Sequence, residues 1–340
     1  MIVPARREEL LACPACSGTL RFFDAGSTCA GCGAHFETKG GVARLRHART
    51  DARTERVREF YTAAPFPGYR ANDTLGTLRA RAERSDFARL LDRAIAGDAR
   101  IVEIGCGTGQ MSLFLATGDR MVVGADMTFA SLELAAGAAH RFGVPGAIFV
   151  ETDLRAPALR AAAFDVVYCS GVLHHTPDPR ASFAAVARLA KPGGVIVLGL
   201  YNLYARVPHK LRRAAAKLTS YKAIPFDPVL RDRAEEPDRR EAWLRDQYLH
   251  PEEHCHSIAE VQGWFRDNDV EFLRTYPTAL IGAPAVEAEE LFTAAEDDWW
   301  FENLLSQIAW STTLGREGGL FMAIGRSRTS SEPDRPRSPG

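Results

Sequence analysis

Three acidic residues stand where they could hold a ligand that carries a positive charge and a ribose. Glu103 lies in an apolar run that leads into the glycines of residues 105–109, and Asp126 and Asp153 each follow a later apolar run. A carboxylate beside a glycine turn suits a cationic group better than a phosphate. An acid about 20 residues beyond such a turn is placed to accept from ribose hydroxyls, and Asp153 could accept from an adenine amino group. These residues therefore predict a site for a cationic, adenosine-containing ligand.

The elements that position these acids can be located in the sequence. Ile101, Val102 and Ile104 predict a buried strand, residues 105–109 a glycine turn, and residues 111–116 have the spacing of a helix. Glycine permits positive φ and lets a ligand lie against the backbone, and the helix start offers unpaired N–H groups. Dinucleotide-binding turns usually read G-x-G-x-x-G, whereas this turn reads G-x-G-x-G, which favours a different adenosine ligand.

Further apolar runs predict six more strands, so the pattern is typical of an α/β protein. These strands are expected at residues 121–125, 147–150, 164–169, 195–199, 270–276 and 318–325. Between them, helical periodicity is found at residues 75–96, 128–142 and 179–190. The expected fold is a Rossmann-like, doubly wound sheet of seven strands.

Residues 100–110 resemble motif I of the class I S-adenosylmethionine (SAM) methyltransferases. Residues 172–178, Val-Leu-His-His-Thr-Pro-Asp, and 191–194, Lys-Pro-Gly-Gly, resemble small-molecule members of this superfamily, such as the enzymes that methylate quinone precursors. The resemblance spans residues 98–200. It implies an antiparallel last strand, SAM as the methyl donor, and direct displacement in which alignment and exclusion of water carry the catalysis. The donor-site residues expected on this basis are Glu103, Gly105, Cys106, Gly107, Gly109, Asp126, Met127, Asp153, Leu154 and Ser170.

Four of the seven cysteines fall in the first 32 residues, as two C-x-x-C knuckles. Four thiolates at this spacing can hold a zinc ion tetrahedrally and fold a segment too short for its own core. Two disulfides are the alternative reading, and a cytoplasmic location would disfavour them. We therefore expect residues 1–47 to form a zinc ribbon in which Zn²⁺ is bound by Cys13, Cys16, Cys29 and Cys32.

The acceptor side of the site is expected to come from three segments. Residues 60–69, dense in aromatics and prolines, form either a rigid loop or a lid over the donor. His174 and His175 follow the strand at 164–169 and either supply a general base or hold their loop through a backbone hydrogen bond. Residues 246–256 either line the substrate side or form a capped helix start, and a second metal there is disfavoured. The candidate catalytic residues are His175 and His174, and the candidate substrate residues are Tyr61, Phe66, Tyr69, Tyr201, Tyr248, His250 and His254.

Composition bounds the class of protein. The 340 residues are 46% hydrophobic and 25% charged, as in ordinary globular proteins. A formal net charge of -1 and a pI near 6.8 give no overall attraction to nucleic acid or to anionic membranes. No apolar run approaches the roughly 18 residues of a membrane span, and residues 1–7 lack the apolar core of a signal peptide. We expect a cytoplasmic protein without membrane attachment.

The expected organisation has four parts. A zinc ribbon at 1–47 is followed by a linker and N-terminal helices at 48–97. The methyltransferase domain at 98–326 carries helical insertions at 200–256 and 286–310, and residues 327–340 are expected to be disordered. The aromatic residues of 286–310 are expected in the core or at a homodimer interface.

These expectations favour SAM-dependent methylation of a small molecule, such as a natural product or a cofactor precursor. One alternative is RNA, because a zinc ribbon ahead of a methyltransferase also resembles bacterial 23S rRNA guanine-N1 methyltransferases, and the basic segment 206–222 could contact phosphates. The neutral pI and the acidic, aromatic C-terminal insertions are unlike an RNA groove. The other alternative is a non-catalytic partner protein that keeps the fold, against which the intact donor motif argues.

Overall fold

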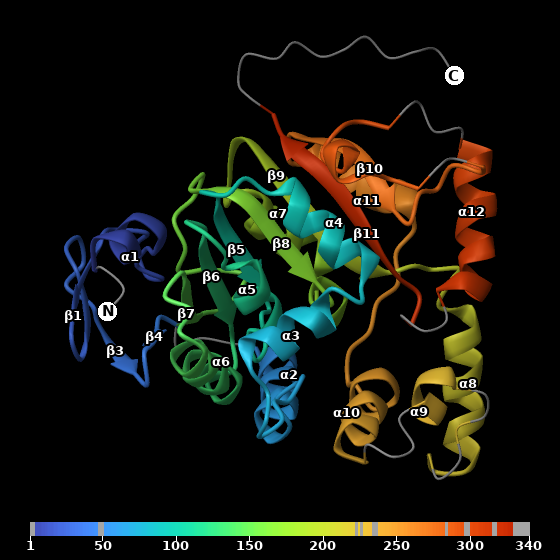
Figure 1. The fold of residues 1–340 in the computed structure, drawn as a ribbon, viewed down its shortest axis with the longest axis horizontal. Coiled ribbons are helices and arrows are strands. Elements are labelled where there is room, and N and C mark those ends of the chain that lie inside the picture. Colours follow the sequence, from blue (N-terminus) through green and yellow to red (C-terminus); the bar gives the residue numbers. More distant parts are fainter. Residues whose placement is uncertain are drawn as a thin grey trace.

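The computed structural model describes residues 4–46, 51–221, 224, 227–232, 237–282, 285–295, 300–314 and 318–328. Within these ranges the strands form a sheet of eleven strands in the order β1-β2-β3-β4-β7-β6-β5-β8-β9-β11-β10 (Figure 1). Their bounds are β1 Leu20–Phe23, β2 Gly26–Cys29, β3 His35–Lys39, β4 Val42–Arg44, β5 Arg100–Ile104, β6 Met121–Asp126, β7 Ala147–Glu151, β8 Phe164–Ser170, β9 Ala190–Tyr201, β10 Val270–Tyr276 and β11 Leu320–Ser327.

Helices cover both faces of this sheet. Their bounds are α1 Pro4–Leu10, α2 Ala52–Ala63, α3 Leu75–Ala82, α4 Asp86–Ala94, α5 Gln110–Leu115, α6 Phe129–Phe142, α7 Pro179–Ala187, α8 Val207–Leu218, α9 Pro228–Asp232, α10 Pro237–Tyr248, α11 Ile258–Asp267 and α12 Trp300–Thr313, with 3₁₀ turns at Leu173–His175 and Ala288–Glu290. One core contains apolar residues of α4, α5 and α6, and the other contains those of α7 and α11. The chain is thus a three-layer α/β structure, as expected.

The seven strands expected for the α/β domain are present in the order of a doubly wound sheet. β5 pairs in parallel with β6 and β8, β6 with β7, and β8 with β9. β11 lies antiparallel between β9 and β10. The strand order reverses at β5, which places the glycine turn after β5 at the switch point where such sheets bind their ligands.

The expectation of a seven-stranded sheet was wrong in one respect, because the N-terminal segment continues the sheet. β4 pairs in parallel with β7, with Ala43 opposite Val150, and the Leu45 N–H donates to the Glu151 carbonyl at 2.8 Å. The Arg44 Nε donates to the buried Glu151 carboxylate at 2.7 Å. Strand β7 would otherwise leave its backbone groups unpaired at an open edge, and β4 covers that edge. Figure 1 shows the N-terminal strands, in blue, beyond β7 at the side of the sheet.

Two predicted elements differ from the structure. The helix expected at 75–96 is divided into α3 and α4, because Ser85 begins a new helix by accepting from the Ala88 N–H at 3.4 Å. The fifth strand, expected at 195–199, begins at Ala190, and the Lys-Pro-Gly-Gly turn forms an irregularity within β9.

The aromatic insertion divides between core and surface. In α12, Trp310 is buried against Phe321 with ring centroids 5.9 Å apart, whereas the Phe301 side chain is 44% exposed. The homodimer interface expected there stays a prediction. Strand β11 extends to Ser327, and most of the expected tail, 329–340, lies outside the described residues. None of the described helices is long and apolar enough to span a bilayer.

Replacing Arg44 tests how firmly the N-terminal segment is joined to the sheet. Arg44→Ala would leave the buried Glu151 carboxylate without its guanidinium partner, while Arg44 itself is partly exposed. We expect the free energy of unfolding to fall by about 1–3 kcal/mol in denaturant titrations. Arg21→Ala, at an exposed position of β1, should change it by less than about 0.5 kcal/mol. Equal effects of the two substitutions would contradict a stabilising β4–β7 junction.

Candidate functional site

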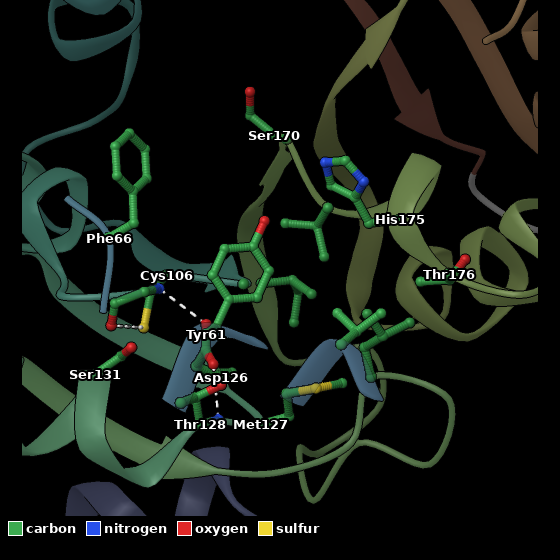
Figure 2. Close-up of a pocket in the computed structure, with 18 of the residues that line it drawn as sticks. Tyr61, Phe66, Cys106, Asp126, Met127, Thr128, Ser131, Ser170, His175 and Thr176 are labelled. Carbon is green, nitrogen blue, oxygen red and sulfur yellow. Dashed lines mark hydrogen bonds between the residues drawn. The ribbon is translucent and has the colours of Figure 1, made fainter. Parts of the chain in front are cut away.

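A cavity of about 600 Å³ lies at the carboxyl ends of β5, β6, β7 and β8. Nine of the ten expected donor-site residues line it, all except Gly109. Figure 2 shows Asp126, Met127 and Thr128 on one side of this pocket and Ser170 and His175 on the other. Parallel strands end at one edge of a sheet, so the acids that follow them in the sequence come together in space.

The glycine turn is fixed by the Asp126 carboxylate. Its Oδ2 accepts from the Gly107 N–H at 2.9 Å and its Oδ1 from the Thr128 N–H at 2.8 Å. Burial raises the pKa of Asp126, and these two N–H donors oppose that rise. Gly109, with φ of 76°, begins α5, and a Cβ there would lie 2.7 Å from the Phe149 ring. Asp126 therefore holds the glycine turn at the wall of the cavity. Glycine at position 109 allows the turn to pack closely against Phe149.

Glu103 is a buried carboxylate at the wall of the cavity. The Ser112 hydroxyl donates to it. Burial raises the pKa of Glu103 to about 7, and the nearby charge of Asp126 adds to that rise. Burial makes this carboxyl group costly to ionise, and a cationic ligand bound beside it would favour the ionised form.

Asp153 lines the cavity, and its carboxylate is already paired. The Arg155 guanidinium donates to both of its oxygens, from Nη2 at 2.7 Å and from Nε at 3.1 Å. Arg155 also forms an ion pair with Asp51, the residue that caps the N-terminus of α2. The adenine contact expected of Asp153 therefore has to share this carboxylate with Arg155, and the ion pairs join α2 to the cavity wall.

Residues 66–69 lie directly on the glycine turn. A Cβ at Gly107 would be 2.5 Å from the Phe66 carbonyl oxygen, so this approach requires glycine. The Tyr69 hydroxyl donates to the Thr108 carbonyl at 2.7 Å, and the Gln110 amide donates to the Gly68 carbonyl at 3.0 Å. The loop thus covers the turn as a lid would. Tyr61 and Phe66 line the cavity (Figure 2). Tyr69 does not line it, and its hydrogen bond to Thr108 holds the loop against the glycine turn.

His175 and Tyr201 line the other half of the cavity. The His175 Nδ1 lies 2.7 Å from the Glu252 carbonyl oxygen, and because a carbonyl only accepts, Nδ1 carries the hydrogen and Nε2 is the acceptor. Burial lowers the pKa of His175 to about 4, although the bond to Glu252 opposes this. At neutral pH this side chain is therefore a neutral hydrogen-bond acceptor and a weak base.

Four other predicted residues are not brought to the cavity wall. His174 is fully buried between His175 and Tyr201, with ring centroids 4.3 and 4.0 Å away. His250 packs behind His175, with centroids 3.7 Å apart. The Tyr248 hydroxyl donates to the Asp227 carboxylate at 2.5 Å, and His254 lies beside Glu252, in a separate hollow. His174 and His250 pack against His175 and so support the site, whereas Tyr248 and His254 lie outside the cavity. From the segment 246–256, Gln247 lines the cavity instead.

Several lining residues were missed by sequence reasoning. They include Thr54, Val57, Met111, Thr128, Ser131, Arg155, Thr176, Trp243, Gln247 and Leu320. Trp243 and Gln247 are four residues apart on α10 and so share one helix face, which is the signal that could have identified them. Thr54 and Val57 of α2 likewise are three residues apart.

The four N-terminal cysteines converge on one point. Their sulfur atoms all lie within 4.8 Å of one another, with Cys16 and Cys29 at 3.4 Å, and none forms a disulfide. The Gly31 and Cys32 N–H groups donate to the Cys29 sulfur at 3.3 and 3.5 Å, which stabilises a thiolate. Four convergent sulfurs with such donors fit a tetrahedral zinc site.

Comparison with known proteins agrees with this arrangement. Residues 102–198 match the family model described as methyltransferase domain. An uncharacterised protein of Synechococcus sp. is 28% identical over 69% of this chain and 64% of its own length. A ubiquinone biosynthesis O-methyltransferase of Paracidovorax citrulli is 35% identical over 32% of this chain and 45% of its own length. The chain thus spans less than two thirds of the length of these curated relatives.

Among solved structures, PKMT2 from Rickettsia typhi, in complex with AdoHcy, superposes with a TM-score of 0.53 and 14% identity. The match covers 79% of this chain and 55% of that chain. At this identity the likeness shows the fold alone. The family model identifies residues 102–198 as a methyltransferase domain, and the structural likeness agrees with its Rossmann-like fold.

Ionisation of Glu103 should make binding of a SAM-like cation depend on pH. If the carboxylate form is required, affinity should rise about tenfold between pH 6 and pH 8, because the pKa of Glu103 is about 7. Glu103→Gln should remove this rise, and Glu83→Gln, at an exposed position, should preserve it. Calorimetric titration at several pH values measures the effect. A wild-type affinity independent of pH would exclude the role given to Glu103.

Proposed function

We propose, from the premise that residues 102–198 form a class I SAM-dependent methyltransferase domain, that this chain transfers the methyl group of SAM to a small-molecule acceptor. The observation that carries the proposal is a single cavity that holds Glu103 and Asp126 in one half and His175 and Tyr201 in the other. A cavity of about 600 Å³ is of the size that encloses small ligands. Donor and acceptor could therefore meet inside the protein, away from water.

Each half of the cavity has a proposed task. Glu103 would face the cationic part of SAM, and Asp126 would accept from the ribose hydroxyls while it holds the glycine turn. Methyl transfer from a sulfonium needs little covalent help, so the protein chiefly aligns the two reactants and excludes water. His175 would accept a hydrogen bond through Nε2, in the tautomer that the Glu252 carbonyl selects, from a neutral donor group of the acceptor molecule rather than from its attacking atom.

A small acceptor is favoured over RNA, because the described part of the basic segment, residues 206–221, does not present a row of outward cations. Arg206 is fully buried, Arg213 lies 3.6 Å from the Glu253 carboxylate and Arg212 lies 3.7 Å from that of Asp227. Lys210 and Lys217 are exposed. Within residues 206–221, these two exposed lysines would give only weak, salt-sensitive binding to phosphates. Tight, steeply salt-dependent binding to rRNA fragments would overturn the proposal for a small acceptor.

Replacing Asp126 tests the donor half directly. Asp126→Ala should weaken SAM binding by about 2–3 kcal/mol, because a charged acceptor is lost and the Gly107 and Thr128 N–H groups lose their partner. Asp119→Ala, at an exposed position, should leave the affinity unchanged. Titration calorimetry of SAM and of S-adenosylhomocysteine measures both variants. Unaltered affinity in Asp126→Ala would remove this residue from the donor site.

We further propose that the four cysteines bind one zinc ion. Metal analysis of protein purified under reducing conditions should find zinc at about one equivalent per chain. Chelation should unfold the N-terminal segment, because metal-binding energy is folding energy in such small units. Because β4 covers the edge of β7, unfolding should also loosen residues 151–160 and lower SAM affinity. Cys13→Ser should reproduce the effect of the chelator, and Cys255→Ser should not. Absence of zinc would reject the site.

A further inference from the structure

We propose that the acceptor substrate carries an oxyanion, an ionised phenol or a carboxylate, and that Tyr201 donates a hydrogen bond to it, held in that role by Gln247 and the buried Arg206. The inference rests on the proposed function, because it names the acceptor class of the same cavity. It is supported by a chain of hydrogen bonds from Arg206 through Gln247 to Tyr201. The donor and the acceptor of each bond can be assigned, because Arg206 can only donate.

Arg206 is the first donor of this chain of hydrogen bonds. Its guanidinium is 0% exposed and can only donate. Nη1 donates to the Gln247 Oε1 at 2.7 Å and to the Gly318 carbonyl at 2.6 Å. A Cβ at Gly318 would lie 2.6 Å from this Nη1, so glycine is needed for the contact. Since the Gln247 oxygen must face Arg206, its amide nitrogen must face the other way.

Gln247 then fixes the direction of Tyr201. Its Nε2 donates to the Tyr201 hydroxyl oxygen at 2.7 Å. Because the Tyr201 hydroxyl oxygen accepts this hydrogen bond, its own hydrogen does not point towards Gln247. Tyr201 and Gln247 both line the cavity. The direction of the Tyr201 O–H is thus constrained by the buried Arg206 through Gln247, and in our proposal this O–H donates to the bound acceptor.

The electrostatics of this wall favour a negative ligand. The Arg206 guanidinium carbon lies 3.7 Å from the centroid of the Tyr201 ring. Arg206 pairs with Glu253 through two bonds, of 2.8 and 3.2 Å, and Arg213 approaches the same carboxylate at 3.6 Å. Two guanidinium groups thus share one carboxylate. Burial keeps the pKa values of His174 and His175 below their usual range, so these rings are neutral, and among the described groups around Glu253 two guanidinium groups face one carboxylate.

An oxyanion also satisfies the chemistry of the step. The oxyanion attacks the methyl carbon of SAM, an O–C bond forms, and the S–C bond breaks with its electron pair left on sulfur. One positive and one negative charge disappear together, and no proton needs a base. This matches a site whose histidine, with a pKa near 4, is a weak base. An ordinary alcohol would need a stronger one.

The test uses protein loaded with S-adenosylhomocysteine, which allows binding without turnover, at pH 8. 4-Nitrophenol and benzoate are the probes, and they distinguish phenolates from carboxylates. The wild type should bind at least one of them. For bound nitrophenol, whose visible spectrum reports ionisation, the apparent pKa should be lower than in water. Nitrobenzene, which is neutral, serves as the control ligand.

Two variants address the direction of the hydrogen bond. Tyr201→Phe removes the hydroxyl, and Gln247→Glu replaces the amide donor by an acceptor that turns the Tyr201 hydrogen away from the cavity. Each should weaken binding of the anionic probe about tenfold or more and return the pKa of bound nitrophenol toward its value in water. Nitrobenzene and S-adenosylhomocysteine should bind as before. Tyr204→Phe, three residues along and not in the cavity wall, is the matched control.

The outcomes separate the two proposals. If the wild type does not bind S-adenosylhomocysteine, the proposed function fails. If it binds the product but neither anionic probe, or if Tyr201→Phe binds the anion as tightly as the wild type, the proposed function stands and the oxyanion inference is overturned. A loss of S-adenosylhomocysteine binding confined to Tyr201→Phe and Gln247→Glu would also contradict it, because these side chains would then serve the donor.

Discussion

The pairing of β4 with β7 holds one end of the loop that forms part of the cavity wall. The residues that follow β7, from Thr152 to Arg155, line the cavity, and the stretch is held at both of its ends. At its start, β4 bonds to Glu151; beyond it, the Ala12 N–H donates to the Ala158 carbonyl at 3.1 Å, and the Arg160 N–H to that of Leu10 at 2.9 Å. The cysteine-rich segment is thus a clamp for this loop, and any ligand contact made by Asp153 depends on it.

The half of the cavity that contains Glu103 and Asp126 could be predicted because its sequence signals are local. Strand, glycine turn and helix follow one another directly, and the acids at 126 and 153 come at strand ends, so parallel pairing alone brings them together. The eleven-stranded sheet could not be predicted in the same way. Val42 and Ala43 form too short an apolar run to show which strand they pair with, and the partner, β7, is about 100 residues away in the sequence.

Part of the other half of the cavity, which contains Tyr201 and Gln247, could not be predicted, for a different physical reason. In the sequence, Arg206, Arg212 and Arg213 belong to a charge run, which is usually a solvated face. Their carboxylate partners, Asp227 and Glu253, lie outside that run, so the sequence near residue 206 does not reveal that an arginine there is buried. Tyr201 and His175 were correctly placed at the cavity because they follow the strand ends, whereas Gln247 comes from α10, whose position depends on tertiary packing.

The contact between the Phe66 carbonyl and Gly107 has a kinetic consequence. The covering loop is bonded to the donor turn itself, through Tyr69 to Thr108 and Gln110 to Gly68. If the nucleoside of the proposed donor lies under this loop, its release would require those bonds to open. The residence time of the spent donor would then limit turnover, whatever the speed of methyl transfer. A chain built in this way would carry its own product through purification, and its first turnover would be faster than the following ones.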